Sequence, residues 1–137
     1  MDLEKYVVRA SGPRATILLV DDASFCRELI SNALRREGYA VCTAGNGPDG
    51  LAALDQVAVQ LIILDNEMPL MDGVTFLRHL RENRDWAFLP VVMLAGSALK
   101  ETVLKAREFG AAEYLLKAEF SLDRLLERVR KWLPAGY

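Results

Sequence analysis

Five short apolar segments, each followed by an amphipathic segment, run through this chain and constrain its fold more than any other feature. The apolar segments have the length of buried strands and occupy residues 16–20, 39–43, 61–64, 90–94 and 114–116. The first amphipathic segment carries five apolar residues at helical spacing, which are expected to face inward: Cys26, Leu29, Ile30, Ala33 and Leu34. Strands that alternate with helices in this way predict an α/β fold, with a parallel sheet and right-handed crossovers.

The alternating pattern extends over residues 15–133 and predicts a single domain. Residues 1–14 are interpreted as an N-terminal extension, and residues 134–137 as a C-terminal tail or the start of a linker. No segment resembles a helix-turn-helix unit. We therefore expect the chain either to work alone through protein contacts or to be cut from a longer protein.

Composition narrows the classes of partner and the compartment. The net charge is −2, whereas nucleic-acid-binding proteins usually carry a basic face, so direct binding to nucleic acid is not expected. No apolar run reaches the roughly 18 residues of a membrane helix, which argues against a membrane protein. The two cysteines, Cys26 and Cys42, lie in apolar patterns, which indicates buried, reduced thiols and a cytoplasmic location.

Three acidic residues stand at the ends of two predicted strands. Asp21 and Asp22 follow the first strand, and Asp65 ends the third. In an open parallel sheet, ligands bind at the carboxyl ends of the strands where the strand order reverses. For the order 2-1-3-4-5 this point lies between the first and third strands, so we expect one shared pocket. The alternative is a set of solvated loop carboxylates, because Asp is common in turns.

Such a cluster requires a compensating positive charge. Two like charges about 4 Å apart repel by roughly 4 kcal/mol at an effective dielectric constant of 20. Mg²⁺ suits one or two carboxylates together with waters and a phosphate oxygen, and Lys117 at the end of the fifth strand adds a further positive charge. A carboxylate nucleophile, Mg²⁺ and a lysine are components that phosphoryl transfer to an aspartate requires.

Five motifs run along the chain, and the first, third and fifth contain these residues: ILLVDDASFCREL, GNGPDGLAAL, LIILDNEMPLMDG, PVVMLAGS and GAAEYLLKAEF. Together they resemble the response-regulator receiver family of two-component signalling, of the chemotaxis-regulator type. The resemblance extends over nearly the whole chain. It implies a flavodoxin-like (βα)5 fold, which is a three-layer sandwich with a parallel five-stranded sheet of order 2-1-3-4-5.

The resemblance also implies a role for each acidic residue. Asp65 matches the phosphoacceptor of the family. Asp22 matches the direct Mg²⁺ ligand, and Asp21 matches the residue that acts through a water molecule. Glu67, two residues after the acceptor, matches the position whose backbone carbonyl binds the metal together with Asp65.

On the other side of the expected pocket, Lys117 and the backbone N–H of Gly96 match groups that contact the phosphoryl group, and Tyr114 matches the aromatic switch residue. Two positions depart from the family. Ala95 stands where receivers usually have Thr or Ser, so this position offers no hydroxyl to a phosphoryl group or to the usual coupling with Tyr114. One such donor contributes about 3 kcal/mol to a transition state. Ala118 replaces the usual proline, and we expect a trans peptide bond before it.

The resemblance implies a phosphorylation-dependent switch that accepts a phosphoryl group from a histidine kinase or phosphotransfer protein. Enzymatic activity beyond self-phosphorylation and autodephosphorylation is not expected. A downstream protein or a second copy would bind the face of the fourth helix, fifth strand and fifth helix. Because of Ala95 and Ala118, an atypical receiver that binds partners independently of phosphorylation is the alternative. A hydrolase of the haloacid dehalogenase type fits less well. Proteins of that class carry a D-x-D motif after their first strand, where this chain has Asp21-Asp22-Ala23.

Overall fold

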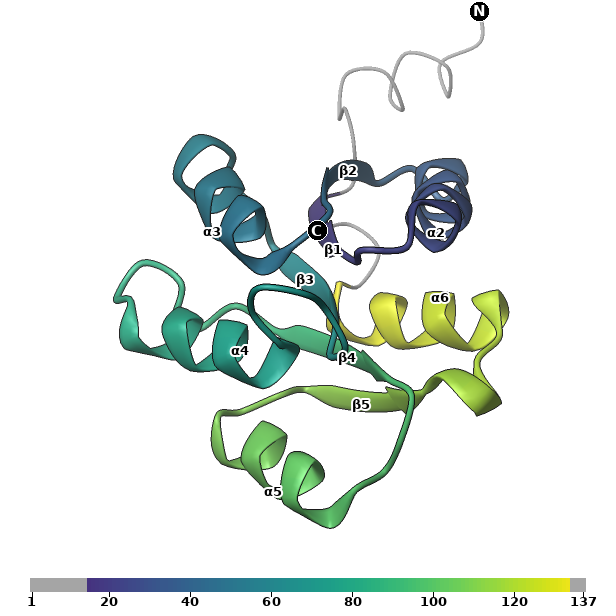
Figure 1. Cartoon of the computed structure of the whole chain (residues 1–137). Coiled ribbons are helices and arrows are strands. Elements are labelled where there is room, and N and C mark those ends of the chain that lie inside the picture. Colours follow the sequence, from purple (N-terminus) through teal and green to yellow (C-terminus); the bar gives the residue numbers. More distant parts are fainter. Residues whose placement is uncertain (1–14, 134–137) are drawn as a thin grey trace, which may run out of the picture.

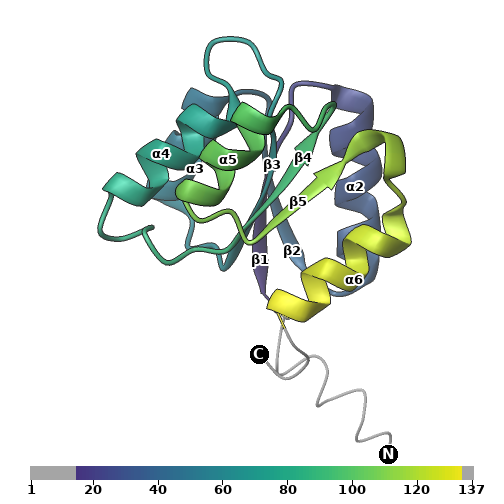
Figure 2. The ribbon, with the colours of Figure 1, turned by 90° about the horizontal axis from the view of Figure 1, so that it is seen from below.

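The computed structural model describes residues 15–133. A five-stranded sheet lies between two layers of helices, which is the three-layer α/β architecture predicted from the sequence (Figures 1 and 2). The two segments interpreted as an N-terminal extension and a C-terminal tail, residues 1–14 and 134–137, lie outside the described residues.

The sheet has the strand order β2-β1-β3-β4-β5, and every neighbouring pair is parallel, as predicted. Its strands are β1 (Thr16–Val20), β2 (Ala40–Ala44), β3 (Leu61–Asp65), β4 (Val91–Ala95) and β5 (Glu113–Leu116). All residues of β3 and β4 are buried, which agrees with their nearly continuous apolar sequence.

The helices are α2 (Ser24–Arg36), α3 (Gly47–Gln56), α4 (Gly73–Glu82), α5 (Lys100–Glu108), the short 3₁₀ helix η1 (Lys117–Glu119) and α6 (Leu122–Trp132). Helices α2 and α6 cover one face of the sheet, and α3, α4 and α5 cover the other (Figure 2). Alternate residues of one strand feed the two cores: Ile17 packs with the α2–α6 layer, whereas Leu18 packs with the α3–α5 layer. Within residues 15–133, no helix is both long enough and apolar enough to span a bilayer.

Several details differ from the sequence predictions. Strand β4 spans Val91–Ala95 instead of residues 90–94, and β5 begins at Glu113 instead of at Tyr114. Strand β2 begins at Ala40 instead of at Tyr39, because the Tyr39 N–H bonds to the Leu34 carbonyl (3.2 Å) and completes the turn after α2. Leu29 was expected to face inward but is 41% exposed, since it lies at the margin of the apolar stripe that buries Ile30 and Leu34.

The two cysteines are free thiols, as expected, but the structure corrects their predicted burial. Cys26 and Cys42 are each only partly buried. Cys26 lies in the first turn of α2, and Cys42 lies in β2 at the edge of the sheet, where packing covers side chains less completely than in β3 or β4.

Candidate functional site

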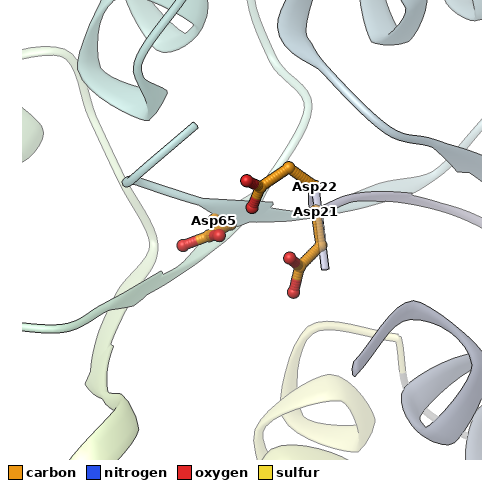
Figure 3. Close-up of side chains that lie close together, drawn as sticks. All are labelled: Asp21, Asp22 and Asp65. Atoms are coloured by element: carbon orange, nitrogen blue, oxygen red, sulfur yellow. The ribbon is translucent and has the colours of Figure 1, made fainter. Parts of the chain in front are cut away.

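Three carboxylates meet at the carboxyl ends of β1 and β3, which is the point where the strand order reverses. Asp21 and Asp22 follow β1, and Asp65 is the last residue of β3. One carboxylate oxygen from each lies within 4.8 Å of the others. Figure 3 shows the three side chains lying close together. The sheet therefore gathers acids that are 43 residues apart in sequence, as Asp22 and Asp65 are.

These three carboxylates differ in burial and in hydrogen bonding. Asp21 and Asp65 are each 1% exposed, whereas Asp22 is exposed. The Asp21 Oδ1 accepts a bond from the Ala23 N–H (2.9 Å), and Arg27 donates to the Asp21 backbone carbonyl (2.7 Å). These bonds hold the β1–α2 turn and direct the Asp21 carboxylate into the cluster.

Asp65 has one satisfied oxygen and one without a hydrogen-bond partner. Its Oδ1 accepts from Lys117 Nζ at 2.9 Å and from the Glu67 N–H at 3.2 Å. Its Oδ2 is buried and has no hydrogen-bond partner among the described residues. A buried carboxylate oxygen of this kind is normally paired, so Oδ2 is the atom at which a ligand or a reacting group would gain most.

Electrostatics around Asp65 oppose its ionised form. Burial is the main cause that raises the pKa of Asp65, to about 6, and the negative charge of Asp21 adds to this rise against the hydrogen bond from Lys117. For Lys117, burial lowers the pKa, but the hydrogen bond and charge of Asp65 outweigh burial and raise it above its usual value. Lys117 is therefore a permanent cation beside a carboxylate that is mostly ionised at neutral pH.

The residues of the cluster fit Mg²⁺. Two buried carboxylates and one exposed carboxylate, with one oxygen of each within 4.8 Å of the others, supply the oxygen ligands that this ion prefers. The negative charge of Asp21, which adds to the effect of burial in raising the pKa of Asp65, is also a charge that a divalent cation would neutralise.

The turn between β3 and α4 positions Asp65 through a close backbone contact. The Gly73 N–H donates to the Asn66 carbonyl (2.9 Å), and the Asn66 side chain accepts from the Val74 N–H (3.2 Å). A Cβ added at Gly73 would lie 2.7 Å from the Asn66 Cα and 2.8 Å from the Asp65 carbonyl oxygen. Only glycine allows this approach, which explains the Asp72-Gly73 pair after the acceptor strand.

Across the cluster, the carboxylate of Glu67 lies against the two groups that the family resemblance assigned to a phosphoryl group, Gly96 and Lys117. The Gly96 N–H donates to Glu67 Oε1 (2.9 Å) and Oε2 (3.0 Å), and Lys117 Nζ lies 3.8 Å from Glu67 Oε2. Sequence reasoning considered only the backbone carbonyl of Glu67 and missed its side chain. The available signal was an acidic residue two positions after Asp65, combined with a glycine directly after β4.

The remaining predicted residues lie around the same end of the sheet. Ala95 is the last residue of β4 and is fully buried. Because it is an alanine, its side chain offers no hydroxyl to the site. The Tyr114 hydroxyl donates to the Ser97 carbonyl (2.9 Å) and thereby links β5 to the loop after β4. The peptide bond before Ala118 is trans, as expected, because the described residues contain no cis peptide bond.

Comparison with known proteins decides the family. The sequence profile of the response regulator receiver domain matches residues 17–130. The chain belongs to this family. Receiver domains of two-component systems bind Mg²⁺ at an acidic cluster, and in this receiver domain Asp21, Asp22 and Asp65 form such a cluster.

Individual relatives agree with this assignment. The receiver domain is 34% identical to the probable transcriptional regulatory protein TcrX of Mycobacterium tuberculosis over 91% of this chain and 52% of TcrX. It is 31% identical to the chemotaxis protein CheV3 of Helicobacter pylori over 85% of this chain and 40% of CheV3. The structure of the Vibrio cholerae chemotaxis protein CheY4 superposes with a TM-score of 0.81 and 32% identity, covering 87% of this chain and 98% of CheY4.

The curated relatives are longer than this chain, which spans about half of TcrX and less than half of CheV3. The similarity to these two proteins therefore covers only part of each of them, and their activities as full-length proteins are not assigned to this chain.

Proposed function

We propose that this receiver domain is a phosphorylation-dependent switch in a two-component phosphorelay. It accepts a phosphoryl group on Asp65 from a phosphohistidine of a histidine kinase or a phosphotransfer protein, with Mg²⁺ bound at the cluster. The observation that carries the proposal is the buried, partnerless Oδ2 of Asp65, which lies beside two further carboxylates and carries Lys117 on its other oxygen.

In this reaction, Oδ2 of Asp65 attacks phosphorus, the P–N bond to the donor imidazole breaks, and the released nitrogen takes a proton. The products are an aspartyl phosphate and a neutral histidine. Lys117 holds Oδ1 at 2.9 Å, which leaves Oδ2 as the free nucleophile and provides a positive charge near the transferred oxygens.

Mg²⁺ would be held by Asp22 and Asp65 directly, by Asp21 through water, and by the backbone carbonyl of Glu67. When bound, the ion supplies charge neutralisation for the carboxylates and the incoming phosphoryl oxygens. The chemistry of the domain is then limited to its own phosphorylation and dephosphorylation, with no separate substrate.

The output surface that we propose is the face of α5, β5 and α6. Leu99 and Leu104 are 66% and 49% exposed on or beside α5. Next to them, a groove is lined by Val103, Tyr114 and Phe120, so apolar surface lies close to the switch tyrosine. A downstream protein or a second copy would bind here, because Tyr114 connects this face to the loop that follows β4.

We also propose a cytoplasmic location. Histidine kinases and phosphotransfer proteins donate phosphoryl groups in this compartment, and the free thiols Cys26 and Cys42 are compatible with its reducing conditions.

The direct test is incubation with acetyl phosphate and Mg²⁺, followed by intact mass measurement. We expect the gain of one phosphoryl group, its absence in Asp65→Asn, and its retention in Asp85→Asn, a matched change at the opposite end of the sheet, just after α4. No gain in the wild-type protein, either from acetyl phosphate or from a competent phosphohistidine donor, would refute the proposal. The remaining candidate function would then be a receiver that binds partner proteins independently of phosphorylation.

A further inference from the structure

The side chain of Glu67 has a position that the proposed phosphoryl transfer does not use. Its carboxylate accepts from the Gly96 N–H with both oxygens, at 2.9 and 3.0 Å, and approaches Lys117 Nζ at 3.8 Å. These two donors lie at the ends of β4 and β5, next to Asp65, and they are the groups expected to contact a phosphoryl group there.

We propose that the Glu67 carboxylate competes with the phosphoryl group for Gly96 and Lys117. The Glu67 side chain must leave these two groups before Asp65 can be stably phosphorylated. The proposal rests on the proposed function of Asp65. A carboxylate resembles a phosphoryl group in its charge and in its acceptor oxygens, so the same N–H and ammonium groups bind either of them. Both cannot occupy the Gly96 N–H at once.

The two interactions of Glu67 differ in weight. The ion pair with Lys117 is half-exposed and long, and pairs of this kind contribute little. The bond from Gly96 is charge-assisted, is much shorter than the contact with Lys117, and uses a backbone donor directly after β4. The Gly96 contact is therefore the one that holds the carboxylate in the site.

Residue identities around Gly96 make the competition more effective in this chain. A Cβ at position 96 would lie 3.0 Å from both Glu67 oxygens, so glycine leaves the room that the carboxylate occupies. Ala95 has no hydroxyl, so the Gly96 N–H is a larger share of the donors available to a phosphoryl group. The Glu67 side chain is 50% exposed, which allows it to turn out into solvent when displaced.

The proposal is tested with beryllofluoride, a phosphoryl mimic, titrated at saturating Mg²⁺ into the wild type, Glu67→Ala and Glu67→Gln. We expect Glu67→Ala to bind beryllofluoride about tenfold more tightly, the factor expected from losing one competing hydrogen bond to a charged group. Glu67→Gln retains a neutral acceptor and should gain less. Glu108→Gln removes the same charge at the far end of α5 and should bind as the wild type does.

A second readout distinguishes competition from a general change in the domain. The Gly96 amide resonance should shift in Glu67→Ala without any ligand, because its N–H loses the Glu67 carboxylate. Equal or weaker beryllofluoride binding in Glu67→Ala would overturn the role of Glu67. If neither the wild type nor any variant binds beryllofluoride or accepts a phosphoryl group, the proposed function of Asp65 itself fails.

Discussion

Among single residues, Asp65 is the one whose properties depend most on its neighbours. Burial and the charge of Asp21 raise its pKa to about 6, although Lys117 donates a hydrogen bond to it. In an unfolded chain the same carboxyl would titrate near its ordinary pKa of 3.8. Between these two values the folded state binds more protons than the unfolded state, so this group stabilises the fold less as the pH rises.

From this sign we predict that Asp65→Asn stabilises the metal-free domain at pH 7 by about 1–2 kcal/mol. Removing the buried charge gains about 3 kcal/mol, at about 1.4 kcal/mol per pKa unit, and the weaker hydrogen bond from Lys117 offsets part of this gain. The gain should shrink as the pH falls through the window from about 6 to 3.8 and should be small at its lower end. Urea denaturation in EDTA at pH 7 and pH 4 measures this difference. A variant that is no more stable than the wild type at pH 7 would contradict it.

Ala95 is the second residue that merits a direct test, because it ends β4 without a hydroxyl. We predict that Ala95→Ser raises the rate of self-phosphorylation from acetyl phosphate by about tenfold or more. One added donor to developing phosphoryl charge contributes up to about 3 kcal/mol, and a tenfold rise requires about half of this. The rate is followed by intact mass. Ala52→Ser, on the exposed side of α3, is the control and should leave the rate unchanged. An unaltered rate in a folded Ala95→Ser protein would argue against a phosphoryl group at this position.

Among the elements, α4 is linked to two neighbouring segments by the side chain of one arginine. The guanidinium of Arg81 donates to the carbonyls of Phe109 (2.8 Å), Gly110 (2.9 Å), Leu89 (2.8 Å) and Ala87 (3.2 Å). Burial lowers the pKa of Arg81, yet the group stays charged because its ordinary value is so high. This one side chain ties α4 to the segment before β4 and to the turn after α5.

We predict that Arg81→Lys destabilises the domain by about 1–3 kcal/mol, because an ammonium group cannot reach carbonyls on two separate segments and leaves several of them unpaired. Arg78→Lys is the matched control, since Arg78 lies three residues earlier in α4 in a mostly exposed pair with Glu82, and it should change stability by less than about 0.5 kcal/mol. Chemical denaturation compares the two. Similar losses for both variants would mean that the carbonyl contacts of Arg81 contribute little.

Across the whole molecule, the sheet joins two cores and ends in the acidic cluster, so binding at the cluster is coupled to folding of the entire domain. The cluster takes its ligands from β1 and β3, which exchange hydrogen bonds at the centre of the sheet. An ion that binds only when these strands are in place stabilises all of the structure and not one loop.

We therefore predict that Mg²⁺ at 100 times its Kd raises the free energy of unfolding by about 2.7 kcal/mol and raises Tm. The effect should be largely lost in Asp22→Asn, which removes an exposed ligand without disturbing the core, and retained in Asp85→Asn. Thermal denaturation in MgCl₂ and in KCl of equal ionic strength measures it. An equal rise of Tm in both salts would mean that screening, and not a bound ion, is responsible.

The fold and the main residues of the acidic cluster could be predicted from local sequence patterns. The alternation of apolar and amphipathic segments predicted the sheet and its helices, because hydrophobic periodicity is a property of neighbouring residues. Asp21, Asp22, Asp65 and Lys117 were found as a group, because each stands at the end of a strand and parallel strands bring those ends together.

Tertiary structure alone decided which atoms face one another. The Glu67 carboxylate accepts a hydrogen bond from the Gly96 N–H, 29 residues away in the sequence, and Arg81 donates one to the carbonyl of Phe109, 28 residues away. The raised pKa of Asp65 likewise depends on burial and on Asp21 from another strand. Hydrogen bonds and desolvation act through space over a few ångströms, so they are determined only when folding has brought distant segments of the chain into contact.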